Sequence, residues 1–231
     1  MRKFSLLRSL ALPIPLLLIS LNQCEDIKEG CEVKEFYISP NFSEYKIETV
    51  ALLPMAYDDT TDDGTFYSTN HFYNKLLEMN RYNLVDIDKF TASDSSDIAA
   101  LLKSIKDSLK INLDSLYSTS LGKFLKSQNC DAIIIGNIFD YNKYYFTNTR
   151  YGLFYRFYFL TESNFNYFMV SLKDGKILWA ANVDGKAYYE FYDNWFSVKI
   201  IYPPLDVSIS NGIDALLVKL KKETFLESKV N

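Results

Sequence analysis

The pattern of apolar and polar positions predicts several buried strands. An apolar run over residues 47–53 ends at Pro54 and is typical of a strand that is buried on both faces. Residues 82–87 indicate a second strand, and residues 131–139 give the clearest strand signal in the chain. We therefore expect a sheet with a buried centre.

A β-hairpin is predicted near residue 174. Segments 165–172 and 176–183 flank Lys173, Asp174 and Gly175. The Asp-Gly pair supplies the positive φ angles that a tight turn between two strands needs.

Helical periodicity occurs in four segments, in which apolar residues recur every three or four positions. These segments cover residues 66–80, 93–113, 116–128 and 209–220. The second and third segments meet near Asn112 and Asp114, either of which is typical of a helix boundary. Pro203 and Pro204 end the segment before the last helix.

The elements follow one another in the order β-α-β-α-α-β-β-β-α. This order predicts an α/β (α+β) fold, in which helices pack on a mixed β-sheet, as a single domain over residues 46–231. Residues 24–45 begin with charged side chains and show no sustained period. We therefore expect a tether there, which becomes ordered only near residues 36–38.

The N-terminal segment has the organisation of a secretory signal peptide. Basic Arg2, Lys3 and Arg8 precede an apolar run over residues 10–21 that contains two prolines. The run is shorter than the ~20 apolar residues that a membrane-spanning helix needs, and a signal-peptide core fits it better. We expect residues 1–23 to be removed.

The sequence Leu21-Asn22-Gln23-Cys24 resembles the lipobox of bacterial lipoproteins. Leu21 stands three residues before the cysteine, as in that motif, whereas Asn22 and Gln23 depart from the small residues usual between them. The resemblance implies cleavage before Cys24 and a diacylglycerol on its thiol, so that residues 24–45 become a lipid-anchored tether. An ordinary signal peptide that is cut nearby is the alternative.

The charge balance argues against nucleic acid as a partner. The chain has 25 Lys and Arg against 29 Asp and Glu, and nucleic-acid phosphates need a basic surface. Cleavage before Cys24 removes three basic residues, which leaves 22 against 29 and a net charge of −7. Attachment to a membrane would then depend on acyl chains rather than on attraction to anionic headgroups.

Residues that would support catalysis or metal binding are few. The oxygen-rich loop over residues 58–64 lacks the bidentate acid of a calcium loop, because Asn70 stands in the twelfth position. His71 is the single histidine, and neither a G-x-S-x-G elbow nor a glycine-rich phosphate loop occurs. We predict a protein that is not an enzyme and that uses no metal or cofactor, apart from acyl groups on Cys24.

Two further cysteines remain in the mature chain. Cys31 and Cys130 would be able to pair in an oxidising envelope. Cys130 equally fits a small buried residue before a strand, and the sequence leaves both alternatives open.

Aromatic residues are the unusual feature of the composition, with 17 Phe, 18 Tyr and 2 Trp. Residues 139–168 contain Phe139, Tyr141, Tyr144, Tyr145, Phe146, Tyr151, Phe154, Tyr155, Phe157, Tyr158, Phe159, Phe165, Tyr167 and Phe168. One interpretation is a long hairpin whose rings coat a protein partner or lie at lipid headgroups. The other is packing within a strongly twisted sheet.

The segment 151–159 is the best surface candidate within this stretch. Tyr155 and Tyr158 flank Arg156, whose charge would be costly to bury without a partner. We therefore select Tyr151, Tyr155 and Tyr158 as candidate partner-binding residues.

Four sequence segments carry a resemblance to a known family. They are Val50-Ala51-Leu52-Leu53-Pro54-Met55, Tyr82-Asn83-Leu84-Val85-Asp86, Asn129-Cys130-Asp131-Ala132-Ile133-Ile134-Ile135-Gly136-Asn137-Ile138 and Val170-Ser171-Leu172-Lys173-Asp174-Gly175-Lys176-Ile177-Leu178-Trp179. Residues 46–222 thereby resemble the envelope domain shared by the curli-secretion lipoprotein CsgG, the penicillin-binding-protein activator LpoB and the N-terminal domain of TolB. The stretch 140–165 has no counterpart in that family.

The resemblance implies a non-enzymatic lipoprotein of the cell envelope, attached to the outer membrane, that acts as a protein-binding scaffold or assembly factor. It also implies that the Asp131–Gly136 motif and Trp179 belong to the core. The alternative within the same family is a subunit of an oligomeric, CsgG-like secretion pore, although segment 154–160 alternates poorly for such a role. The partner's identity and the formation of a homo-oligomer stay open.

Overall fold

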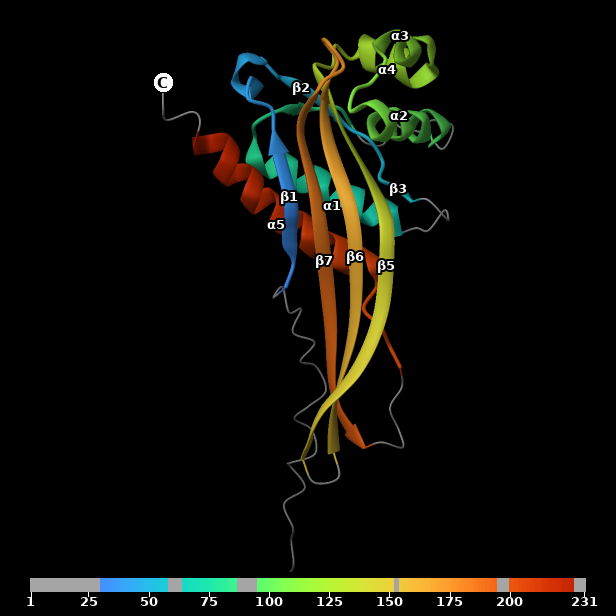
Figure 1. The fold of residues 1–231 in the computed structure, drawn as a ribbon, viewed down its shortest axis with the longest axis vertical. Helices are drawn as coiled ribbons and strands as arrows, with labels where there is room; N and C mark the ends of the chain where they lie inside the picture. The colour runs from blue at the N-terminus through green and yellow to red at the C-terminus, as the bar shows by residue number, and fades with distance from the viewer. Residues whose placement is uncertain (1–29, 58–63, 87–94, 152–153, 195–199, 227–231) are drawn as a thin grey trace, which may run out of the picture.

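A seven-stranded mixed β-sheet is the centre of the fold in this computed structural model (Figure 1). The structure describes residues 30–57, 64–86, 95–151, 154–194 and 200–226. The strands are β1 (Glu32–Ile38), β2 (Thr49–Leu52), β3 (Ala56–Tyr57), β4 (Asn83–Leu84), β5 (Ala132–Tyr151), β6 (Phe154–Ser171) and β7 (Ile177–Asn194). Their order across the sheet is β1-β7-β6-β5-β2-β4, and β3 pairs with β5 beside this path.

Parallel and antiparallel pairs divide the sheet into two parts. β2 lies parallel to both β4 and β5, and β3 also lies parallel to β5. β5, β6 and β7 form an antiparallel meander, and β1 pairs antiparallel with β7. The predicted α/β (α+β) class with a mixed sheet is therefore confirmed.

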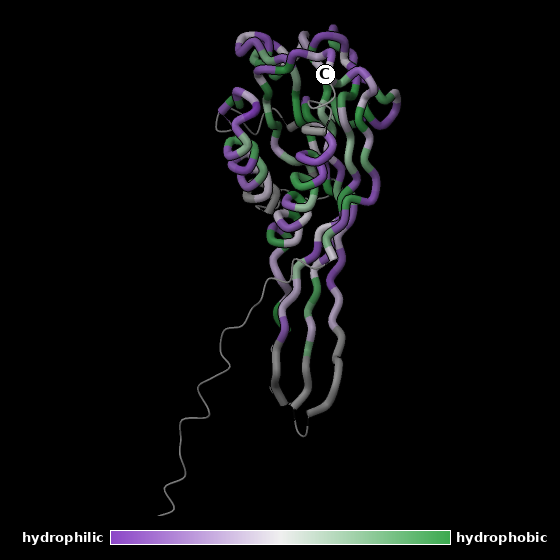
Figure 2. Tube along the Cα trace, turned by 90° about the vertical axis from the view of Figure 1, so that its left-hand side faces the viewer, coloured by the Kyte–Doolittle hydropathy of each residue, from purple (hydrophilic) through white to green (hydrophobic). Residues whose placement is uncertain are grey.

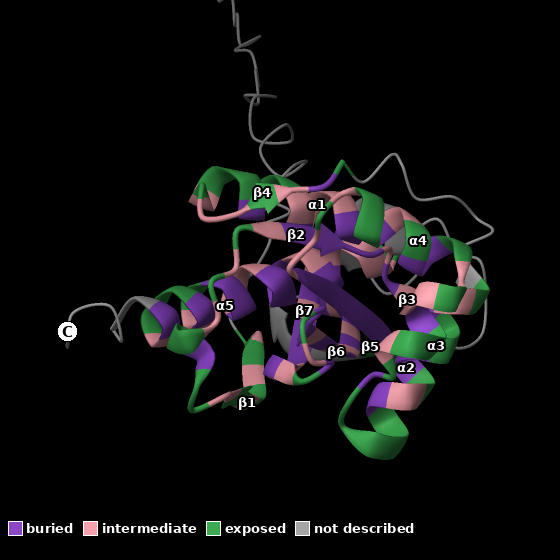
Figure 3. Cartoon of the chain, turned by 90° about the horizontal axis from the view of Figure 1, so that it is seen from above, coloured by how far each residue is buried: buried purple, intermediate pink, exposed green. Residues whose placement is uncertain are grey.

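Helices cover both faces of one end of the sheet (Figure 1, Figure 3). They are α1 (Gly64–Met79), α2 (Ser95–Ser108), α3 (Leu113–Ser118), α4 (Ser120–Ser127) and α5 (Leu205–Leu226), with a short 3-10 helix at Phe42–Glu44. α1 and α5 pack on one face, and α2, α3 and α4 pack on the other.

Side-chain caps set the boundaries of the short helices. Asn112 Oδ1 accepts a hydrogen bond from the backbone N–H of Asp114 at the start of α3. Thr119 Oγ1 accepts one from the backbone N–H of Gly122 at the start of α4. The predicted boundary near Asn112 is confirmed, whereas the helix predicted over 116–128 is two helices because Thr119 caps the second.

Alternating side chains of the central strands build a core on each face. Ile134 of β5 is 1% exposed and belongs to the same core as Ile213 of α5 and Trp179 of β7. Ile133 and Ile135 belong to the core beneath α2, α3 and α4. A strand that is buried on both faces has apolar side chains at every position, which explains the continuous apolar run in the sequence.

Strand β1 occupies part of the segment that the sequence predicts as a tether. Residues 32–38 pair with β7, so order begins at residue 32 and the expectation that it begins only near residues 36–38 is wrong for residues 32–35. Val33 and Phe36 both pack against the core beneath α5. A β-bulge between Val33 and Glu35 breaks the alternation, which explains why the sequence shows no sustained period here.

β5, β6 and β7 continue beyond the helices as a three-stranded stalk (Figure 1, Figure 2). The pairing of β3 with β5 ends at Ile138, and the pairing of β1 with β7 begins at Asp184. We define the stalk as residues 140–151, 154–163 and 185–194. The strands that the hydrophobic pattern predicts end before the stalk begins. A long hairpin here agrees with one of the two interpretations of the aromatic stretch.

The predicted turn between β6 and β7 is present at Asp174 and Gly175. Gly175 has a φ of 72°, a conformation that favours glycine. The Asp174 carboxylate accepts a 2.8 Å hydrogen bond from the Tyr45 hydroxyl and lies 3.2 Å from Lys176 Nζ. Partial burial acts to raise the pKa of Asp174, but these contacts outweigh it and hold the pKa at about 2.

Asp174→Asn is expected to lower the free energy of unfolding at neutral pH by ~0.5–1.5 kcal/mol, the usual contribution of such a hydrogen bond. A carboxyl whose folded pKa lies below its unfolded value of ~3.9 stabilises the fold above that value and loses the contribution as the pH falls through about 2. Urea titrations should therefore show that the difference between the two proteins shrinks on acidification. A difference that is independent of pH would contradict the assigned role of the charge.

Candidate functional site

The strand register assigns the side chains of the stalk to two faces. Residues directly opposite each other in an antiparallel pair lie on the same face. Phe159 of β6 lies opposite Tyr145 of β5, and Leu160 lies opposite Tyr144. A β-bulge after Ile138 adds one residue to β5, so odd-numbered residues replace even-numbered ones on the side of α5. We call the two sides the α5 face and the open face.

The α5 face of β6 is packed like a core. Phe157 and Phe159 are 5% and 1% exposed. The Phe159 ring lies 5.6 Å from the Tyr202 ring, edge to face, and Thr161 Oγ1 donates a 2.6 Å hydrogen bond to the carbonyl oxygen of Pro203. The chain that leads into α5 thus covers this part of β6. The surface prediction for segment 151–159 is therefore wrong for Phe157 and Phe159.

Charged side chains cover the open face where the stalk meets the body. Asp184 Oδ2 lies 3.0 Å from Lys186 Nζ and 3.4 Å from Lys34 Nζ, and Glu162 lies 3.3 Å from Lys186. Partial burial acts to lower the pKa of Lys186, but the two carboxylates raise it to about 12. Each carboxylate thus faces an ammonium group, which makes the cluster a structural ion network. Within the described ranges, His, Cys, Asp and Glu nowhere gather in threes that would hold a metal ion.

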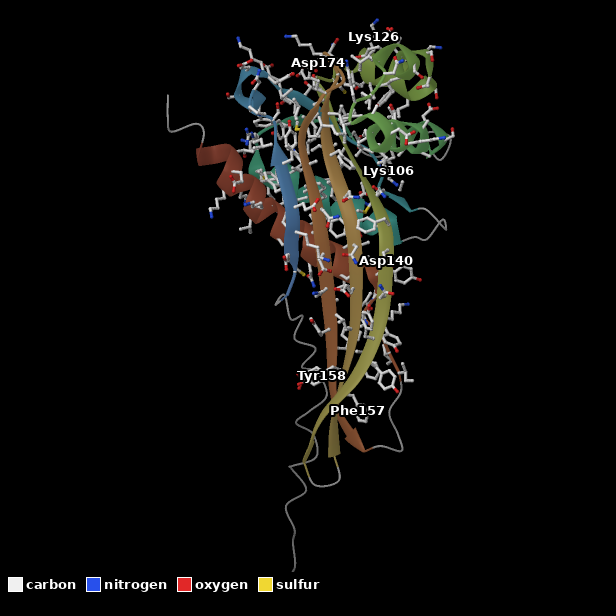
Figure 4. All side chains as sticks on the ribbon, viewed as in Figure 1. Lys106, Lys126, Asp140, Phe157, Tyr158 and Asp174 are labelled. Carbon is white, nitrogen blue, oxygen red and sulfur yellow. The ribbon has the colours of Figure 1, made fainter. Side chains whose placement is uncertain are left out.

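Further along the stalk, the open face carries aromatic and apolar side chains. Tyr144 is 44% exposed, and Tyr158, Leu160 and Tyr188 are half-buried. Tyr144, Leu160 and Tyr188 lie side by side across the three strands. Figure 4 shows Tyr158 and Phe157 on opposite sides of the stalk, and no described helix lies over the open face at this level (Figure 1).

A second group of exposed aromatic residues follows the outer strand of the stalk. We define the edge row as Phe139, Tyr141, Lys143 and Tyr145 of β5; the Tyr145 side chain is 61% exposed. Lys143 Nζ lies 5.7 Å from the centre of the Tyr141 ring. Among the described residues, no strand pairs with the outer edge of β5 beyond Ile138. The edge row therefore combines an unpaired strand edge with accessible rings.

The structure describes one of the three predicted partner-binding side chains. Tyr158 lies on the open face, whereas Tyr151 and Tyr155 belong to β5 and β6 with side chains outside the described residues. The register places position 155 opposite positions 150 and 193, and position 158 opposite positions 146 and 190. The assignment of the three tyrosines to one partner-binding surface therefore stays a prediction.

The cysteines have separate surroundings. Cys24 lies outside the described residues, as does the oxygen-rich loop over 58–63. Cys31 and Cys130 are both free. The Cys31 sulfur accepts a 3.2 Å hydrogen bond from the backbone N–H of Lys186, and burial raises the pKa of Cys130 to about 11. The disulfide that the sequence left open is therefore not formed.

The single histidine links two helices. His71 Nε2 of α1 lies 2.9 Å from Asp214 Oδ1 of α5, and both side chains are partly exposed. No role for this pair is predicted from the sequence. Its position between α1 and α5 indicates a contact that holds these helices together.

A hollow of about 550 Å³ lies at the end of the molecule opposite the stalk. It is lined by Ser104, Ser108, Lys110, Ile111, Asn112, Leu113, Asp114 and Asp174. Its polar groups take part in local structure, since Asn112 caps α3, Ser108 donates to the Lys110 carbonyl oxygen and Asp174 binds Tyr45. The stalk is therefore the stronger candidate for function.

Comparisons with known proteins find similar structures but no family. No protein-family model and no curated protein matches the chain. The PelC dodecamer from Paraburkholderia phytofirmans is 12% identical with a TM-score of 0.41, and the match covers 80% of this chain and 94% of that one. Lipoprotein GNA1162 from Neisseria meningitidis is 13% identical with a TM-score of 0.35, over 78% and 99% of the two chains.

The hypothetical protein CT253 from Chlamydia trachomatis is 11% identical with a TM-score of 0.37, and the match covers 76% and 96% of the two chains. Similarities at this level assign no function to the chain. The resemblance to the superfamily of CsgG, LpoB and the TolB N-terminal domain thus stays a prediction. In the part of the chain that the structure describes, none of the helices combines the length and apolar character needed to span a membrane.

Proposed function

We propose that the chain is a lipid-anchored, non-enzymatic protein of the cell envelope that binds a protein partner through the edge row of its stalk. Acyl groups on Cys24 would hold it in the outer membrane. The observation that carries the proposal is the exposure of Tyr141 and Tyr145 beside an unpaired strand edge. Aromatic residues are enriched at protein interfaces because a rigid ring buries a large area at low entropic cost.

The chemistry of the edge row favours an extended segment of the partner. A strand added beside β5 would satisfy its outward backbone N–H and C=O groups and would cover the flanking rings. Lys143 is exposed between Tyr141 and Tyr145, so acidic residues in the added strand would be favoured. Tyr151 and Tyr155 lie further along the same hairpin and are additional candidates for contact.

Tyr145→Ala is expected to weaken partner binding by ~2 kcal/mol or more, as truncation of an interface hot spot does, with thermal unfolding almost unchanged. The matched control is Leu109→Ala, because Leu109 is 71% exposed on the body, away from the stalk. Crosslinked pull-downs from envelope fractions would compare both variants with the wild-type protein. Retention of the partner by Tyr145→Ala, or an equal loss in both variants, would contradict the assignment.

A second candidate is a self-assembling component, such as a subunit of a CsgG-like secretion pore. The observation in its favour is that the stalk has two edges without described partners, one on β5 beyond Ile138 and one on β7 beyond Asp184. A second copy would be able to pair β5 with β7 and build a ring or a chain. Native mass measurement in mild detergent separates the two candidates, because the first predicts a monomer and the second a defined multiple.

A further inference from the structure

The described chain begins beside the open face of the stalk. Gly30 precedes β1, and a Cβ atom built on it would lie 3.4 Å from Lys186 Cδ and 3.8 Å from the Tyr188 hydroxyl. Cys31 is fixed at the same level by its hydrogen bond with the Lys186 N–H. The segment that leads back to Cys24 therefore leaves the domain at the open face, next to Tyr188.

The length of that segment limits how the molecule is oriented on a membrane. Five residues lie between Cys24 and Gly30, so the Cα atoms of the two are six steps along the chain and at most ~22 Å apart. From Lys186, β7 extends ~30 Å through the helical body to its first residue, Ile177. The anchor thus does not reach past the helical body, which excludes an orientation with the body against the membrane and the stalk directed away from it.

The stalk is longer than the segment that would hold it away from the membrane. Eight residues of β7 follow Lys186 up to Asn194, which corresponds to ~27 Å. A stalk directed at the membrane therefore reaches the lipid before the anchoring segment is fully extended. A stalk that lies along the membrane has its open face nearest to the lipid, because the segment leaves the domain on that face.

The composition of the open face matches the headgroup region of a bilayer. Tyr144, Tyr158 and Tyr188 combine an apolar ring with a hydroxyl group, and Leu160 lies among them. Tyrosine is favoured at this depth, where one end of the side chain is apolar and the other is hydrated. The ion network around Asp184 borders the same face on the side of the body.

Deep insertion of a single stalk is unfavourable. The outer edges of β5 and β7 have no described strand partner along the stalk, and unpaired backbone groups cost several kcal/mol each in hydrocarbon. Arg150 and Arg156 also lie near the end of the stalk, and charged side chains are costly at the bilayer centre. Both features favour contact of the stalk with the headgroup surface over insertion into the hydrocarbon.

We infer that the open face of the stalk, with Tyr144, Tyr158, Leu160 and Tyr188, lies against the phospholipid headgroups of the leaflet that holds the anchor. The inference rests on the proposed acylation of Cys24, and it assigns lipid to the open face while the edge row stays available to protein. A single stalk would then have two different partners on its two sides.

Site-specific photocrosslinking tests this arrangement in the full-length protein. Benzoyl-phenylalanine would be introduced in separate experiments at position 158 on the open face, at position 145 in the edge row, and at position 218. Val218 is 70% exposed on α5 and is the matched control. The probe is a vesicle of phosphatidylethanolamine and phosphatidylglycerol that carries the purified lipidated protein, and mass spectrometry identifies each adduct. Thermal unfolding confirms that each variant is folded.

The inference predicts phospholipid adducts at position 158 and none above background at position 218. Absence of lipid adducts at position 158, or adducts with a second copy of the chain there, would overturn it. The mass of the N-terminal peptide reports in the same samples whether Cys24 is acylated, so failure of the anchor is distinguished from failure of the surface assignment. Pull-downs with Tyr145→Ala test the protein-binding proposal independently.

Discussion

Gly185→Val is expected to prevent stable folding. α5 crosses β7 at this residue, and a Cβ atom on Gly185 would overlap the backbone carbonyl oxygen of Ser208 and approach Ser163 Oγ. Gly212 of α5 faces the same crossing, since a Cβ atom there would lie 3.0 Å from the Gly185 Cα. Because the backbones of α5 and β7 touch here, no rotation of a neighbouring side chain can make room for the added atoms. α5 would have to move away from the sheet.

The expected loss exceeds the ~1–3 kcal/mol that is usual for an overpacked core, because α5 supplies core residues along its whole length. Ile209, Ile213 and Leu216 are each 0% exposed, and a domain has only ~5–15 kcal/mol of total stability. Urea and thermal unfolding, followed by circular dichroism, would measure the effect. A variant that unfolds like the wild-type protein would show that α5 is not packed as described.

Ala180→Val is the matched control for this experiment. Ala180 lies in the same strand, on the face that α5 does not cover, and is half-buried. Valine is favoured in strands, so we expect a change within ~0.5 kcal/mol, as for substitutions outside the core. Similar losses in both variants would point to a general sensitivity of β7 rather than to the crossing with α5.

The parts of the fold that follow simple periodicity are predictable from the sequence. Residues 131–139 are apolar at almost every position because α1 and α5 cover one face of the strand and α2 to α4 the other. The turn at Asp174 and Gly175 is encoded largely by Gly175, which adopts the positive φ that the turn needs. The cap at Asn112 is likewise a local signal, because its side chain bonds to the backbone two residues later.

Bulges explain most of what the sequence does not predict. Because of the bulge after Val33, the core-facing residues Val33 and Phe36 of β1 are three positions apart, so the sequence shows no strand periodicity there. The bulge after Ile138 moves the odd-numbered residues of β5 to the α5 face, so a reader of the sequence who extends the alternation from Ile134 assigns Tyr144 and Tyr145 to the wrong sides. A bulge is an insertion relative to the partner strand, and therefore it cannot be located before the pairing is known.

The sequence predicts which segment contains the candidate site, but not which residues of that segment are exposed. The aromatic content of residues 139–168 indicates a special role, but burial there depends on the chain around Tyr202, more than 30 residues later in the sequence. That chain covers Phe159 and leaves Tyr145 exposed. The packing interpretation is thus confirmed for Phe157 and Phe159, whereas contact of the exposed rings with a partner or with lipid stays a prediction. Tyr145 lies on the same face as Phe159 but on the outer strand of the stalk, where its side chain is exposed.

Cys24→Ala is expected to abolish stable membrane attachment. Each buried CH₂ of an acyl chain contributes ~0.8 kcal/mol, and stable attachment needs more than one chain or a second signal. The chain from Cys24 onward would have a net charge of −7, so it would gain little from anionic lipid, and the tyrosines of the open face would lie at the headgroups without inserting. The stalk alone would therefore give only weak and reversible contact.

Fractionation and intact mass together test the role of Cys24. Loss of the thiol either releases a processed chain from the membrane or leaves the signal peptide uncleaved, and the higher mass of the uncleaved chain identifies the second case. Cys130→Ala is the matched control, because it removes a half-buried thiol just before β5 without touching the N-terminal segment. The control should stay in the membrane with the mature mass. If Cys24→Ala also stays there with an unchanged mature mass, the acyl anchor is wrong, and the tether length no longer constrains which face of the stalk meets the lipid.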